Sequence, residues 1–246
     1  GVGALTYALE ILTGLMGSAR RWRTMPWLVI LFGIMIVPLG VVSITFIIIQ
    51  PIIIGTWCTL CLIAAAAMLL QIPYSLDEIL ATAQFLIRRK RAGQSVLRVF
   101  FVGDTDEGER SKSSEENFER APSALAKDML SGGVNLPWNL LASVLIGVWL
   151  MFTRLTVGAD GALANADHLI GSLVITVAVT AFAEVARSVR YVNVLFGTAL
   201  LIVPFVYGAA PAIMTSEIVC GVLLILLSLR RGPVRTRYGH WNRLIA

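Results

Sequence analysis

The chain has few charged residues. Of its 246 residues, 14% are Asp, Glu, Lys or Arg, 57% are hydrophobic, and the mean hydropathy is +0.80. A soluble domain carries about 25% charged residues, so this composition argues against a soluble globular protein. The chain also lacks the segments of roughly ten residues with alternating polarity that mark a membrane β-barrel. The composition therefore predicts an all-α membrane protein.

Residues that bind metals are scarce as well. The chain has three cysteines and two histidines, whereas a structural zinc site needs four ligands. Cys220, His168 and His240 are badly placed to join the other two cysteines on the topology predicted below. No metal site is expected.

Long apolar runs are abundant. A membrane-spanning helix needs about 20 mostly apolar residues. The sequence predicts seven such helices, at residues 2–17, 25–49, 57–73, 137–153, 167–186, 191–207 and 216–229.

The basic residues give these helices an orientation. Eight of the 15 acidic residues lie between Asp104 and Asp128, and the chain without that segment has 16 basic and 7 acidic residues. Because short cytoplasmic loops accumulate Lys and Arg, the net charge of +5 reflects topology and nucleic-acid binding is not expected. The basic clusters follow the first, third, fifth and seventh helices and so fall on one side, which is predicted to be cytoplasmic; only Arg154 would face the other side. The first helix then starts outside the cytoplasm, which predicts one more helix upstream of Gly1.

The composition divides the chain into three parts: residues 1–80, 81–135 and 136–246. In the middle part, residues 86–97 mix apolar and basic side chains, which suits either an anionic membrane surface or a simple topological stop. Residues 103–133 are rich in Asp, Glu, Ser and Gly and are expected to form a solvated cytoplasmic linker.

The third part repeats itself at an offset of 50 residues. Four pairs of residues fall in register: Gly147 and Gly197, Leu150 and Leu200, Asp167 and Glu217, Gly171 and Gly221. Each copy is predicted to be a pair of helices whose second helix opens with the acidic residue, with a glycine four residues later that permits close helix packing. His168 is expected to be a solvated residue at the interface, with proton relay as the alternative.

Two cysteines occur in the sequence Trp57-Cys58-Thr59-Leu60-Cys61. Positions three apart share a helix face, and the start of a helix favours a thiolate. On the predicted topology they lie on the outer side, where disulfide chemistry is possible. The spacing favours a redox dithiol, although two ordinary packing cysteines remain possible. Cys220 is expected to be a packing residue.

The first part of the chain resembles the vitamin K epoxide reductase family. The resemblance covers about 70 residues and depends on the order of elements: a helix with Gly3, Tyr7 and Glu10, the basic turn at residues 20–23, a long helix ending at Ile49, and the Cys-x-x-Cys that opens the next helix. It implies a four-helix bundle around a quinone, of which the first helix is missing here.

The resemblance also implies residue roles. Cys58 and Cys61 would be catalytic, with Cys61 reacting with ubiquinone or menaquinone and Cys58 exchanging electrons with a second cysteine pair. That pair, and the family's quinone-contacting asparagine, would precede Gly1. Ala65 stands where animal members have a tyrosine, so Tyr7 and Trp57 are the candidate quinone-binding residues.

The third part resembles the membrane SPW repeat. Residues 203–208 stand at the Ser-Pro-Trp motif with Ser and Trp replaced, and residues 167–171 resemble the second signature. This resemblance implies a membrane location and no established chemistry, so the part is expected to be an accessory or assembly module that could join a membrane-protein complex.

Two functions fit these features. The first is a thiol–quinone oxidoreductase of the bacterial inner membrane that makes disulfides for exported proteins through a thioredoxin-like partner. The second is a noncatalytic membrane assembly subunit that keeps the bundle and lacks the loop cysteine pair.

Overall fold

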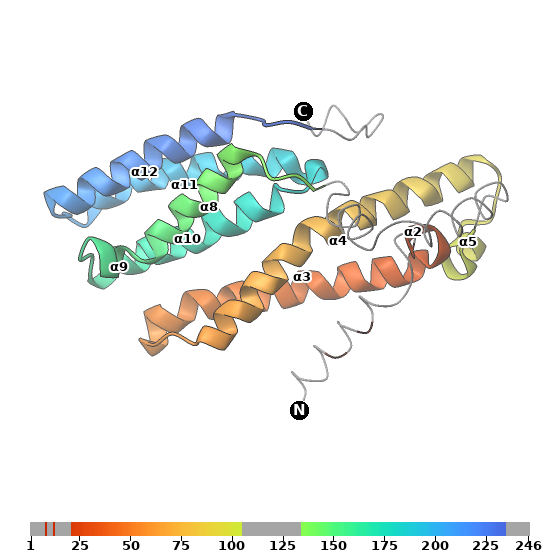
Figure 1. The fold of residues 1–246 in the computed structure, drawn as a ribbon, viewed down its shortest axis with the longest axis horizontal. Helices are drawn as coiled ribbons and strands as arrows, with labels where there is room; N and C mark the ends of the chain where they lie inside the picture. Colours follow the sequence, from red (N-terminus) through yellow and green to blue (C-terminus); the bar gives the residue numbers. More distant parts are fainter. Residues whose placement is uncertain (1–7, 9–11, 13–20, 105–133, 235–246) are drawn as a thin grey trace, which may run out of the picture. The chain divides into compact units, whose positions relative to one another are not determined.

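The computed structural model describes residues 8, 12, 21–104 and 134–234 (Figure 1). Within these residues the regular secondary structure is helical, apart from one isolated antiparallel bridge between Val134 and Ala183. The prediction of an all-α protein is confirmed. The acidic linker, the C-terminal tail and Tyr7 lie outside the described residues.

Five described helices are long and apolar enough to cross a membrane. They are Pro26–Ile54, Thr59–Arg91, Gly161–Thr180, Glu184–Val206 and Pro211–Leu229, and a sixth apolar helix, Trp138–Met151, is shorter. The chain is a multi-pass membrane protein. The predicted helix at residues 2–17 falls almost wholly outside the described residues, so the total of seven stays a prediction.

The chain divides into two compact units, residues 1–38 with 74–132, and residues 39–73 with 133–246. The division runs through two helices, α3 (Pro26–Ile49) and α4 (Thr59–Arg91). It coincides with Pro38 in α3 and Pro73 in α4. Because proline has no N–H to donate and clashes with the preceding turn, these are the points at which each helix is locally weakest.

In the first unit, an ion pair joins α2 (Arg21–Thr24) to α4. The Arg21 guanidinium donates to both carboxylate oxygens of Glu78, at 2.7 and 2.6 Å. A two-pronged bond of this kind fixes the angle as well as the distance between its partners. The basic turn that the sequence analysis assigned to topology therefore also fastens the start of the α3 region to α4.

The third predicted span was expected to end at Pro73, and this is wrong. Helix α4 continues to Arg91, through 33 residues. At 1.5 Å per residue it is about 50 Å long, against about 30 Å for the hydrocarbon core of a bilayer. The apolar run ends near Pro73, but the helix continues through the more polar residues that follow it. After a turn at Gly93 the chain forms α5 (Val96–Val102).

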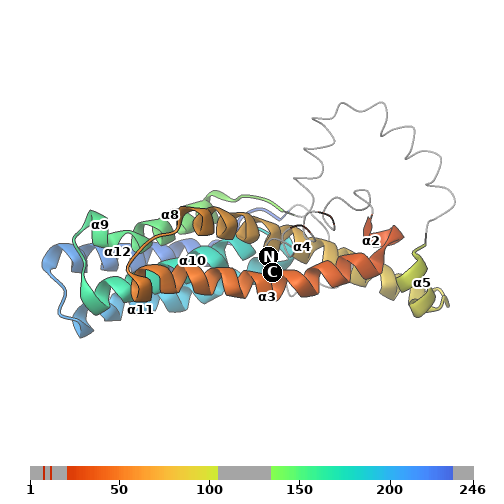
Figure 2. The same ribbon diagram turned by 90° about the horizontal axis from the view of Figure 1, so that it is seen from below.

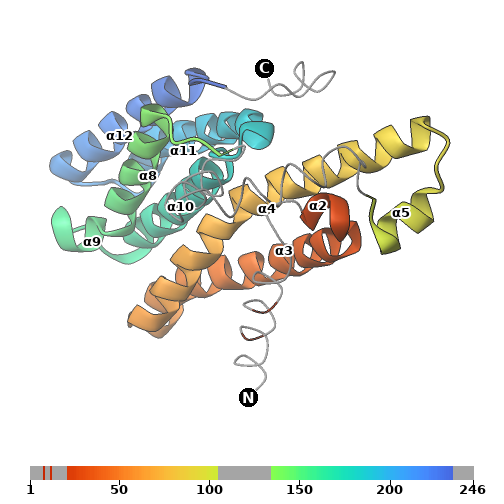
Figure 3. The same ribbon diagram turned by 45° about the vertical axis from the view of Figure 1, so that its right-hand side comes forward.

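The second unit contains the repeat module. Its elements are α8 (Trp138–Met151), α9 (Thr153–Thr156), α10 (Gly161–Thr180), the 3-10 helix η2 (Glu184–Tyr191), α11 (Val192–Val206) and α12 (Pro211–Leu229). Figure 3 shows α8, α10, α11 and α12 side by side. Helix α8 packs most closely on α10, and α11 on α12. These two pairs are the two copies of the repeat.

The centre of the module is symmetric in sequence. Its buried core consists of six residues that form three pairs 50 positions apart: Leu150 and Leu200, Ile170 and Cys220, Val174 and Leu224. The expectation that Cys220 is a packing residue agrees with this position, since only 9% of its surface is exposed. Equivalent residues of the two copies thus meet in one core.

Glycines let the two helices of each copy approach closely. A Cβ atom added at Gly147 would lie 2.8 Å from the backbone oxygen of Gly171, and one at Gly197 would lie 2.9 Å from that of Gly221. Real Cβ atoms are not found at such distances from backbone atoms, so the backbones would have to move apart. The close approach expected at Gly171 and Gly221 is present, and small residues at helix contacts are typical of membrane proteins.

This packing leads to a prediction about stability. Gly147→Ala and Gly197→Ala should each destabilise the chain by about 1–3 kcal/mol, because the added methyl group is overpacked against backbone. Gly40→Ala is the matched control, since its Cβ would meet only the Ile72 side chain at 3.7 Å. Thermal unfolding in detergent should show a lower midpoint for the two module variants only. Equal midpoints in all three would contradict the close contact.

Candidate functional site

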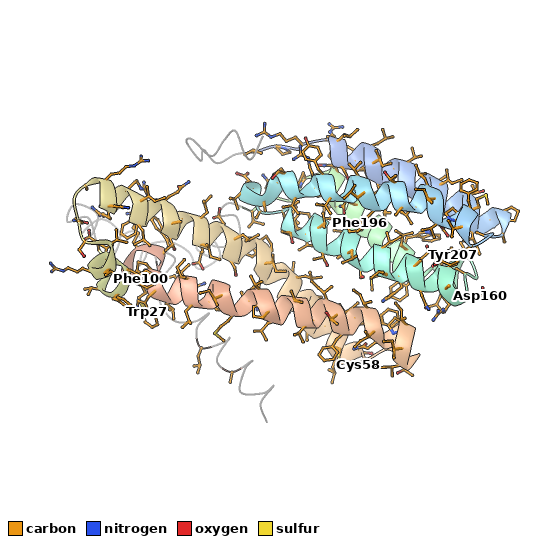
Figure 4. All side chains as sticks on the ribbon, turned by 180° about the vertical axis from the view of Figure 1, so that it is seen from behind. Trp27, Cys58, Phe100, Asp160, Phe196 and Tyr207 are labelled. Carbon is orange, nitrogen blue, oxygen red and sulfur yellow. The ribbon has the colours of Figure 1, made fainter. Side chains whose placement is uncertain are left out.

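The loop between α3 and α4 carries the cysteine pair. Helix α3 passes into a π-helical turn, η1 (Gln50–Ile54), which is followed by Gly55 at φ 74°. Glycine adopts this left-handed conformation without steric cost, and the chain reverses here before α4 begins, as Figure 2 shows in orange. Figure 4 labels Cys58 at this end of the hairpin.

Cys58 caps the first turn of α4. Its carbonyl oxygen accepts the first helical hydrogen bond from the Leu62 N–H, at 3.1 Å. Its Sγ accepts from the backbone N–H of Cys61, at 3.4 Å. This is the position in which a Ser, Thr or Asp oxygen usually satisfies the unpaired N–H groups of a helix start. The cysteine pair therefore lies where helix geometry favours negative charge on the first sulfur.

The hydrogen bonds lower the pKa of the Cys58 thiol. The largest contribution comes from the Cys61 side chain and the next from the Cys61 backbone N–H. A thiolate is the nucleophilic form of cysteine, so this sulfur is the more readily activated one. Cys58 and Cys61 are both exposed, and they are not joined by a disulfide. Together they can act as an accessible dithiol.

Gln50, which was not predicted as a site residue, supports the same loop. Its side chain is buried, with 6% of its surface exposed, and its Oε1 accepts a hydrogen bond from the Cys58 N–H at 3.1 Å. A signal was present, because Gln50 is the only polar residue in the apolar run of residues 46–54. A buried polar group is costly unless it has a partner, so a lone glutamine in such a run indicates a specific bond.

Trp57 lies against the repeat module within the second unit. Its ring stacks on Phe152 with a centroid distance of 5.5 Å, and it meets His168 edge to face at 5.1 Å. The structure thus brings three of the four candidate residues together, Trp57, Cys58 and Cys61. The fourth, Tyr7, lies outside the described residues.

His168 is not a solvated residue, so that expectation is wrong. Only 3% of its surface is exposed. Its two ring nitrogens face the carbonyl oxygens of Ile47 and Met151, at 3.0 and 3.4 Å. The sequence predicted a helix that starts at the acidic residue beside it, whereas α10 begins six residues before that residue and places His168 well inside.

Asp167 and Glu217 are likewise not at helix starts. Helices α10 and α12 begin at Gly161 and Pro211, which puts each carboxyl group almost two turns into its helix. Both side chains are fully buried, and none of their oxygens accepts a hydrogen bond from a described residue. They occupy equivalent places in the two copies, one turn before Ile170 and Cys220 of the core. The module therefore carries an acidic residue inside each copy.

Comparison with known protein families gives two matches. Residues 1–76 match the vitamin K epoxide reductase family, and residues 137–231 match the SPW repeat domain. Both resemblances noted in the sequence are confirmed over these ranges. The first match associates residues 1–76 with membrane redox chemistry, which in that family is linked to quinones. No curated protein and no solved structure matches the chain.

The cap geometry predicts the reactivity of Cys58. A lowered pKa means more thiolate at neutral pH, so the rate of alkylation by iodoacetamide should reach its plateau at a lower pH than for an ordinary thiol, whose pKa is about 8.5. The test uses Cys220→Ala with either Cys61→Ser or Cys61→Ala, so that Cys58 is the only thiol. The serine variant keeps a side-chain donor and should plateau at the lower pH of the two. A profile at or above the ordinary thiol pKa in both would contradict the cap.

The buried carboxyl groups predict a gain in stability. A carboxyl group without a partner in an apolar interior costs about 1–3 kcal/mol, so Glu217→Leu should raise the midpoint of thermal unfolding. Thr215→Leu, at an exposed position of the same helix, serves as the control and should change the midpoint little. A lower midpoint for Glu217→Leu would show that the carboxyl group makes a stabilising interaction.

Proposed function

We propose that the chain is the membrane part of a thiol–quinone oxidoreductase of the bacterial inner membrane, which forms disulfides for exported proteins. The observation that carries this proposal is the Cys58 sulfur at the first turn of α4, held by the Cys61 N–H inside the region that matches a quinone-linked redox family. A capped, exposed thiol three residues from a second exposed thiol is the arrangement that a dithiol needs for disulfide exchange.

The electron balance requires an acceptor and a donor. When the Cys58–Cys61 disulfide forms, the two thiols lose two electrons and two protons. Tyr7 and Trp57 would hold a quinone in the membrane, which would supply the acceptor for both electrons and both protons. The disulfide is then reduced by a thioredoxin-like extracytoplasmic partner: one partner thiolate attacks Cys58 Sγ, Cys61 leaves as a thiolate, and the second partner thiol releases Cys58. The partner leaves oxidised.

The described residues fit a membrane-dissolved quinone as acceptor. Cys61 is exposed on α4, and its neighbours Leu60 and Ile63 are apolar and 78% and 62% exposed. This surface of the helix is suited to lipid, which is where a quinone such as ubiquinone or menaquinone dissolves. Oxidation of the dithiol to a disulfide releases two electrons, which is the number that a quinone accepts. Tyr7 and Trp57 remain the proposed contacts to the quinone.

Purified full-length protein in nanodiscs provides the test. With dithiothreitol as electron donor, the unsubstituted chain should reduce a soluble quinone analogue, measured by the loss of quinone absorbance. Cys61→Ser should lose this activity by about 100-fold or more, because no second thiol remains to complete the disulfide. Cys58→Ser should lose the activity to a similar extent, because Cys61 then has no neighbouring thiol with which to close the disulfide.

Cys220→Ala is the matched control, because Cys220 lies in the repeat core and should leave activity unchanged. Quinone loss that is equally fast with the unsubstituted chain, with a Cys58→Ser, Cys61→Ser double variant and without protein would contradict the enzyme. It would support the alternative, a noncatalytic assembly subunit in which the repeat module contacts other membrane proteins.

A further inference from the structure

The repeat module holds the residue that precedes Cys58. Trp57 is stacked on Phe152 from the end of α8 and touches the edge of His168 from α10. A cavity at this contact is lined by Trp57, Pro51, Phe152, Arg154 and His168, among others. Aromatic pairs of this geometry contribute beyond simple burial. The loop with the cysteine pair therefore packs against the repeat module, within the same unit.

His168 also contacts the backbone near the end of α3. Pro51 has no N–H, so it cannot donate to the carbonyl oxygen four residues earlier, which belongs to Ile47. The Nε2 of His168 lies 3.0 Å from this oxygen. Because a carbonyl oxygen only accepts and this contact is the shorter of the two, we assign the ring hydrogen to Nε2, which then donates in place of the proline. One buried side chain thus contacts both the end of α3 and Trp57.

The second copy of the repeat lacks these two residues. The positions 50 residues after Phe152 and His168 are Ile202 and Ile218. Neither isoleucine can stack on an indole as an aromatic ring does or donate a hydrogen bond, whereas the core positions are apolar in both copies. The module departs from its own symmetry where Trp57 meets it.

We propose that His168 is a positioning residue for Cys58: from the repeat module it fixes the end of α3 and Trp57, and so keeps the Cys58 sulfur on the N–H of Cys61. This rests on the proposed function only in taking Cys58 as the exchanging thiol. It gives the repeat module a role in the redox site. Loss of His168 frees the Trp57 ring edge and leaves the Ile47 oxygen without its donor, so Cys58 spends less time as the cap of α4.

The experiment measures the alkylation rate of Cys58 by iodoacetamide as a function of pH. The full chain in nanodiscs carries Cys61→Ser and Cys220→Ala, so that Cys58 is the only thiol. Adding His168→Ala should slow alkylation at pH 7 about fivefold, as expected for loss of an N-cap contact, and should move the profile to higher pH. His168→Gln, whose amide can donate to Ile47, should restore most of the rate.

Thr176→Ala is the matched control on the same helix, because its hydroxyl donates only to the Ser172 oxygen one turn earlier. It should match the unsubstituted rate. If His168→Ala does not fold, Phe152→Leu replaces it, since it removes the stacking partner of Trp57 and should shift the profile in the same direction. An unchanged rate and profile in the folded variant, His168→Ala or its replacement, overturns the proposal.

The outcome is separable from that of the proposed function. Alkylation of Cys58 needs neither quinone nor partner, so a chain that reduces no quinone can still show the His168 effect. Conversely, an active chain whose Cys58 reacts equally well without His168 keeps the oxidoreductase and loses only the positioning role.

Discussion

A backbone carbonyl that loses its helical donor in an apolar environment needs another donor, and this requirement shapes the second unit. Pro51 creates such a carbonyl at Ile47, and His168 supplies the donor from 121 residues away. The same turn places Gln50 against the Cys58 N–H. A proline near the end of α3 therefore does more than end a helix. It leaves the Ile47 carbonyl oxygen free to accept a hydrogen bond from His168 of α10. This bond, together with the aromatic contacts of Trp57, holds the cysteine loop against the repeat module.

Hydropathy predicted which segments are helical but misplaced several ends. The α3 segment was expected at residues 25–49 and is found at Pro26–Ile49, because there the apolar run and the helix coincide. At α4 the apolar run ends at Pro73, yet the helix continues because its polar half still forms backbone bonds. At α10 and α12 the charged residue was read as a boundary, although a carboxyl group can be buried once neighbouring helices surround it. Hydropathy indicates whether a residue prefers water or an apolar environment. It does not indicate which helices will surround that residue, so it misplaces helix ends.

The candidate site was predictable to the extent that it is local. The apolar run that begins at Trp57 placed Cys58 and Cys61 at the start of a helix, and a cap and its third N–H are neighbours in sequence. The two residues that support the loop, Gln50 and His168, were not predicted, because they are more distant in sequence. Gln50 lies eight residues from Cys58 and left a trace in the sequence as an isolated polar residue. His168 left none, because only the folded chain brings α10 to the end of α3.

The duplicated module shows how a repeat can be used for two purposes. Two identical copies would bury identical surfaces, and the shared core and the paired glycines do so. Most other positions differ between the copies, and two of these differences concern contacts within the second unit. One is the connection between the copies, where the Asn135 amide donates to Glu184 and pairs with Arg187, because only one copy is followed by another. The other is at Phe152 and His168, where chain connectivity gives no reason for a difference. The contact with Trp57 supplies that reason, since one copy touches the loop through these residues and the equivalent positions of the other are isoleucines.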